Sequence, residues 1–85
     1  MEDAEIYREL RPIFQDMLSR KDLELTPDLG PADVPGWDSF KQMVIIVAVE
    51  KRYGIKFRTR ELEDVKTVGD LVRSIRLKIA QGTSL

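Results

Sequence analysis

The segment Gly36-Trp37-Asp38-Ser39-Phe40 contains the serine best placed to do chemistry in this sequence of 85 residues. Ser39 precedes an apolar run with helical spacing, and Gln42 three residues later matches a capping box, so we expect Ser39 to cap a helix. The sequence contains no histidine to deprotonate a serine nucleophile, and no cysteine. A cap worth about 1 kcal/mol is the simpler interpretation of Ser39. The alternative is that another enzyme attaches a reactive group to it.

The composition limits the class of protein. Hydrophobic residues make up 42% of the chain and charged residues 34%, with a net charge of −1, which is typical of a soluble globular domain and disfavours nucleic-acid binding. The longest apolar run, Met43 to Val49, is far shorter than the roughly 20 residues that span a bilayer. The acidic N-terminus does not resemble a secretory signal. We therefore expect one domain over residues 1–85, located in the cytoplasm. We also expect a monomer with no metal site and no membrane insertion.

The spacing of apolar residues predicts the helices that must position Ser39. A first helix, kinked at Pro12, is expected over Asp3 to Arg20, and a second over Ser39 to Tyr53 with Gly54 as its left-handed end. Lys21 to Asp38 reads as a long loop because proline and glycine interrupt it repeatedly. Its apolar residues are expected to anchor it to the core, and they are Leu23, Leu25, Leu29, Val34 and Trp37.

The second half of the chain predicts two more helices. Ile55-Lys56-Phe57 reads as a short extended stretch, and Thr59 as the cap of a brief helix over Arg60 to Asp64. Thr67 and Asp70 match a second capping box, which opens a last helix. The expected fold is an all-α four-helix bundle of three longer helices and one short one, with a long loop between the first and second helices.

Three motifs in register resemble the acyl carrier protein family. They are Asp38-Ser39-Phe40, then Glu50-Lys51-Arg52-Tyr53-Gly54-Ile55, and then Thr67-Val68-Gly69-Asp70. The resemblance covers nearly the whole chain, and Trp37 before Asp38 is similar to specialised stand-alone carriers. It implies that the protein is not an enzyme. It implies instead that a phosphopantetheinyl transferase links 4′-phosphopantetheine from coenzyme A to Ser39, and that Asp38 helps to position the reaction.

The resemblance also gives roles to the neighbours of Ser39. Trp37 and Phe40 could pack along the attached arm or contact the transferase, but the simpler interpretation is that both fill the core. In fatty-acid carriers the second and fifth positions after the serine are acidic, whereas here they are Lys41 and Val44. With Met43, these residues predict a more apolar or basic contact surface, and so acyl-transferring or ligase partners from a dedicated lipid or secondary-metabolite pathway.

Two alternatives remain open at this point. The chain could be an unmodified helical interaction module with a carrier-like fold, or a D-alanyl or other aminoacyl carrier. Ile45, Ile46 and Val49 are expected in a tight core, which makes a long sequestered acyl chain doubtful.

Overall fold

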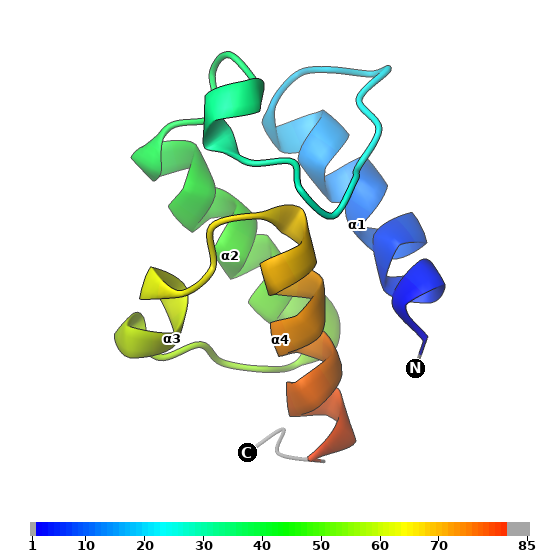
Figure 1. The fold of residues 1–85 in the computed structure, drawn as a ribbon, viewed down its shortest axis with the longest axis vertical. Coiled ribbons are helices and arrows are strands. Elements are labelled where there is room, and N and C mark those ends of the chain that lie inside the picture. Colours follow the sequence, from blue (N-terminus) through cyan, green and yellow to red (C-terminus); the bar gives the residue numbers. More distant parts are fainter. Residues whose placement is uncertain (1, 82–85) are drawn as a thin grey trace.

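The computed structural model describes residues 2–81, and its regular elements are all helical over that range (Figure 1). The three longer helices are α1 (Asp3–Met17), α2 (Ser39–Tyr53) and α4 (Val68–Ala80), and the short one is α3 (Thr59–Glu63). A 3-10 turn over Pro31–Asp33 lies in the long connection between α1 and α2. The structure confirms the predicted all-α fold of three longer helices, one short helix and a long first loop.

The core forms where α1 packs against both α2 and α4. Each helix buries residues spaced three or four apart, as amphipathic helices do. The fully or nearly fully buried residues are Ile6, Leu10 and Phe14 of α1, Ile45, Ile46 and Val49 of α2, and Val68, Leu71, Val72 and Ile75 of α4. None of the described helices is long and apolar enough to cross a membrane.

Helix α1 ends three residues earlier than predicted. It runs through Pro12 without interruption, and Ser19 then adopts a left-handed conformation with φ of 55°. The N–H of Arg20 donates to the carbonyl of Gln15 at 2.9 Å and that of Ser19 to Asp16 at 3.3 Å, which is the Schellman arrangement. The chain therefore turns away at Leu18, before Arg20 can join the helix.

The long first loop is anchored to the N-terminus of α4. The N–H groups of Val68 and Gly69 donate to the carbonyls of Leu29 and Pro27, both at 2.9 Å. These bonds satisfy donors that the first turn of a helix leaves free. The five apolar loop residues all pack on the core, with Val34 and Trp37 buried, so the predicted anchoring is confirmed.

The segment around α3 differs in detail from the prediction. Residues 55–58, which include the predicted extended stretch, form a connection without regular secondary structure, and the N–H of Phe57 donates to Glu50 Oε2 at 2.8 Å. Thr59 is the first residue of α3 rather than its cap, because Glu61 Oε1 accepts the N–H of Arg58 at 2.7 Å. Asp64 lies just beyond the end of α3.

The capping box of α4 forms as predicted. The hydroxyl of Thr67 accepts the N–H of Asp70 at 3.2 Å, and Asp70 Oδ2 accepts those of Lys66 and Thr67 at 3.0 and 3.2 Å. These donors, with the Lys66 N–H contributing most, lower the pKa of Asp70. The box fixes the end of α4 against which the long loop packs.

Candidate functional site

Asp38, rather than Ser39, caps α2. Asp38 has an extended backbone, with φ of −107° and ψ of −172°, and its Oδ1 accepts the N–H of Lys41 at 2.9 Å. The predicted box between Ser39 and Gln42 is therefore wrong, and Ser39 is the first residue inside the helix. A carboxylate suits the cap position well because it also meets the positive end of the helix dipole.

This cap leaves Ser39 available. The residue is exposed, and its hydroxyl makes no hydrogen bond within residues 2–81. The N–H groups of Ser39 and Phe40 likewise meet no acceptor in that range, since the first two donors of α2 precede any carbonyl they could reach within the helix. An accessible hydroxyl thus lies beside two free backbone donors.

Trp37 and Phe40 flank the site in opposite environments. Trp37 is 6% exposed, with its ring edge-on to that of Phe14 at 5.3 Å, so its interpretation as a core residue is confirmed. Phe40 is 71% exposed, so the same interpretation is wrong for Phe40. The difference follows from α2 itself, which turns the side chain after Ser39 away from the core.

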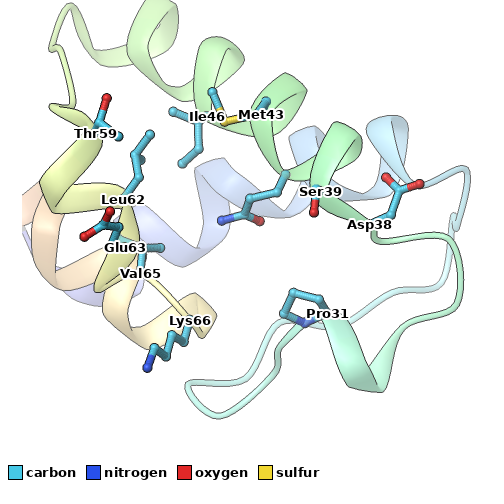
Figure 2. A pocket seen from close by; sticks show the side chains of 11 residues that line it. Pro31, Asp38, Ser39, Met43, Ile46, Thr59, Leu62, Glu63, Val65 and Lys66 are labelled. Carbon is cyan, nitrogen blue, oxygen red and sulfur yellow. The ribbon is translucent and has the colours of Figure 1, made fainter.

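A groove of about 620 Å³ adjoins Ser39 (Figure 2). Asp38 and Ser39 lie at one end of it, Met43 and Ile46 of α2 line one wall, and Leu62 lies opposite on α3. Val65 and Lys66, from the α3–α4 connection, complete that opposite wall. Sequence reasoning made a long sequestered acyl chain doubtful and did not identify an open groove beside Ser39, because the two walls come from segments whose approach depends on the whole fold.

The residues expected to meet partners only partly share one surface. Met43 is 50% exposed, whereas Lys41 and Val44 are half-buried. Val47, which sequence reasoning overlooked, is 45% exposed. Phe40, Met43 and Val47 lie three and four residues apart and so share one helix face. We name these three residues the α2 apolar stripe; the helical spacing within the apolar run was the signal that could have revealed Val47.

The acidic residues near α3 are Glu61, Glu63 and Asp64, and they lie in the part of the chain that the structure describes. No cluster of three or more potential metal ligands occurs there. Glu61 instead pairs with Lys78 at 2.8 Å. The hydrogen bond from the Arg58 N–H, followed by that pairing, lowers the pKa of Glu61, as in a structural carboxylate rather than a general acid.

Comparison with known proteins gives consistent matches over most of the chain. Residues 8–75 match the family model described as a phosphopantetheine attachment site. The acyl carrier protein of Thermosynechococcus vestitus is 30% identical over 80 residues, covering 94% of this chain and 99% of that protein. The acyl carrier protein of Rhodococcus erythropolis is 33% identical, covering 92% of this chain and 86% of that one.

A solved structure shares the fold. The solution NMR structure of the holo acyl carrier protein from Geobacter metallireducens has a TM-score of 0.84 and 36% identity, covering 89% of this chain and 87% of that one. The family-model match spans well over half of the sequence, and the structural match covers an even larger share of it. The chain therefore belongs to the acyl carrier protein family, whose members carry cargo on covalently attached 4′-phosphopantetheine and do not themselves catalyse reactions.

Proposed function

We propose that Ser39 is the residue to which 4′-phosphopantetheine is attached. The observation that carries this proposal is that Ser39 is an exposed serine, with a free hydroxyl, at the N-terminus of a long helix. Two other serines lie in the described residues: Ser19 forms the left-handed turn after α1, and Ser74 is half-buried inside α4. Neither combines accessibility with a helix N-terminus.

The surroundings of Ser39 suit the group chemically. A phosphodiester on its hydroxyl would lie beside the free N–H groups of Ser39 and Phe40 and the positive end of the α2 dipole. The apolar groove beginning at Ser39 offers a surface for the arm. The arm ends in a thiol, which this cysteine-free chain lacks, and that thiol holds the acyl group as a thioester.

Enzymatic conversion of the purified apo protein to the holo form tests whether Ser39 is the attachment residue. We would incubate it with coenzyme A, magnesium and a broad-specificity phosphopantetheinyl transferase, and then measure its intact mass and its thiol content. We expect a mass gain of one arm and one thiol per chain. Ser39→Ala should abolish both, while the matched variant Ser74→Ala should keep both. No gain in the wild type, or a gain that persists in Ser39→Ala, would contradict the proposal.

We further propose that the carrier serves a dedicated pathway. Lys41, Lys51 and Arg52 against Glu50 give α2 a net charge of +2. Between Phe40 and Val47, the exposed residues of α2 are the α2 apolar stripe rather than carboxylates. Partner enzymes that dock there would need an apolar surface, unlike the basic patches that meet an acidic helix. A relative from Mycolicibacterium smegmatis, 32% identical, is named a meromycolate extension acyl carrier protein, so similar carriers include one with a specialised assignment.

Changing the α2 face tests this specificity. Lys41→Glu combined with Val44→Glu should improve turnover of the holo protein by fatty acid synthase enzymes, because it restores acidic positions on the helix. Lys51→Glu is the matched control, since it makes the same charge change at the far end of α2. Val44 is half-buried, so the unfolding free energy of the double variant is measured alongside. Equal turnover by the wild type and the folded double variant would contradict the proposal.

We also propose that the chain works as one carrier domain and as a monomer, with the α2 apolar stripe reserved for partner enzymes. Light scattering on the apo and holo proteins checks this. A dimer that dissociates in Phe40→Ala would show that the stripe joins two copies instead.

A further inference from the structure

Gln42 lies one helical turn after Ser39 and lines the same groove. Residues three apart on a helix are neighbours, about 5–6 Å between their Cβ atoms. A group that leaves Ser39 along the groove therefore passes within reach of the Gln42 side chain. Gln42 does not cap α2, because Asp38 holds that position.

The orientation of that amide is set by Trp37. The indole Nε1 of Trp37 donates to Gln42 Oε1 at 2.7 Å. An indole N–H can only donate, so the Gln42 amide must present its oxygen to it. The Nε2 group is then directed elsewhere, and its two N–H donors have no acceptor within residues 2–81. Since Gln42 is a lining residue of the groove, this places two oriented donors beside it.

Trp37 holds this arrangement firmly. Its ring is 6% exposed and meets the ring of Phe14, itself 1% exposed, at an interplanar angle of 76°. An amide held by a core residue loses little further freedom when it binds a ligand, which favours binding. Trp37 thus contacts Gln42 but is not itself among the residues that line the groove.

We infer that the side-chain amide of Gln42, oriented by Trp37, donates hydrogen bonds to oxygen atoms of the phosphopantetheine arm on Ser39. The arm offers phosphate and amide carbonyl oxygens, both of which accept from an N–H donor. This inference rests on the proposed attachment at Ser39. Gln42 is the binding residue and Trp37 its positioning residue, and together they direct the arm along the groove instead of into solvent.

Nuclear magnetic resonance can observe this contact directly. The sequence contains three glutamines and no asparagine, so the side-chain amide spectrum holds only three NH₂ groups. Gln15 is the internal control, because its Nε2 donates to the carbonyl of Leu23 at 2.9 Å, away from the groove. On conversion from apo to holo, confirmed by intact mass, we expect the Gln42 NH₂ resonances to move and to exchange more slowly. The Gln15 resonances should stay in place.

Two variants separate the parts of the arrangement. Gln42→Glu keeps an acceptor for the Trp37 indole N–H but removes both donors, so the indole resonance should remain near its wild-type position while the arm becomes more mobile in the holo protein. Trp37→Phe removes the indole N–H, and the shift of Gln42 on conversion should shrink. The ³¹P resonance of the holo protein shows which oxygen of the arm accepts from Gln42. If the acceptor is the phosphate, this resonance should shift in Gln42→Glu; if it is an amide carbonyl, it should not.

The outcomes distinguish this inference from the proposed function. If the mass gain occurs but the Gln42 NH₂ resonances stay unchanged, Ser39 is modified and the inferred contact is wrong. If arm mobility is equal in the wild type and in folded Gln42→Glu, the inference also fails. If no mass gain occurs, both the attachment and the contact are overturned.

Discussion

At the scale of single residues, three neighbours have different roles at the proposed attachment site. Asp38 satisfies a donor of the first turn of α2, Trp37 anchors the preceding chain in the core, and Ser39 keeps its hydroxyl free. Had Ser39 been the cap, its oxygen would be bonded to the backbone and its modification would cost that bond. The carboxylate one position earlier removes this conflict.

Two roles of Asp38, as the helix cap and as a negative charge beside Ser39, can be tested separately. Asp38→Asn keeps an acceptor for the Lys41 N–H, whereas Asp38→Ala loses it. We expect Asp38→Ala to lower the unfolding free energy by about 1 kcal/mol and Asp38→Asn to change it little. Both should slow transfer of the arm if the carboxylate positions the reaction. Urea unfolding of the apo protein and a mass-spectrometric time course check this, and an unchanged rate in Asp38→Asn would show that the charge has no part.

Trp37 and Phe40 should respond differently to truncation. Trp37→Ala removes a buried ring, its contact with Phe14 and its hydrogen bond to Gln42, so we expect a loss of about 3–5 kcal/mol in unfolding free energy. Phe40→Ala removes a mostly exposed ring and should stay within about 0.5 kcal/mol of the wild type. Chemical denaturation measures both. A large loss in Phe40→Ala would mean that its ring is packed in solution.

At the scale of elements, the helices were predictable, but the end of α1, the bounds of α3 and the cap of α2 were not. The spacing of buried residues indicates α1, α2 and α4 because each helix must bury one face. The choice between Asp38 and Ser39 as cap could not be made, since both residue types cap well and the decision depends on where the loop ends. The exposure of Phe40 depends on how α2 is rotated against α1, which is a tertiary property. The groove could not be predicted either, because the α3 segment that forms its far wall is too short to show a helical pattern of apolar residues.

The contact between the long loop and α4 makes a prediction about Gly69. Replacing a helical glycine by alanine ordinarily stabilises a protein by roughly 0.5–1 kcal/mol. A Cβ at Gly69 would lie 2.8 Å from the carbonyl oxygen of Pro27, which itself accepts the Gly69 N–H. We therefore expect Gly69→Ala to destabilise the protein and to loosen the loop that leads to Ser39. Thermal unfolding and amide exchange of Val68 and Gly69 test this. If Gly69→Ala is more stable than the wild type, the loop can move away from the added Cβ without a loss of stability.

At the scale of the whole molecule, the absence of histidine and cysteine shapes the dependence of stability on pH. No side chain then has an ordinary pKa near neutrality, so stability should be nearly constant between about pH 6 and pH 9. On the acid side, Asp70 and Glu61 have lowered pKa values in the folded state. Their contribution is present above the pKa values of the unfolded chain, 3.8 and 4.5, and is lost as the pH falls below them.

The stability of the protein at alkaline pH depends on Tyr53, which joins α2 to α1. Burial, and then the hydrogen bond from its hydroxyl to Glu9 Oε1 at 2.7 Å, raise the pKa of Tyr53 above 10.0. A raised pKa means that the folded protein holds the hydroxyl proton of Tyr53 more tightly than the unfolded chain does. The contribution of Tyr53 to stability is therefore complete below pH 10.0 and is lost as the pH rises further. Tyr53→Phe should lose about 1 kcal/mol at neutral pH through the missing bond, and should then fall less steeply at alkaline pH than the wild type.

Urea unfolding across the alkaline range checks this, because lysine deprotonation is common to both proteins and cancels in the comparison. Tyr7→Phe is the matched control: burial and the nearby charge of Asp3 raise the pKa of Tyr7. Its slope should therefore lie between those of the wild type and Tyr53→Phe. If the wild type and Tyr53→Phe lose stability in parallel above pH 10.0, the proton of Tyr53 is not linked to folding. The contact between α1 and α2 would then rest on apolar packing and the ion pair between Arg52 and Glu9 at 3.3 Å.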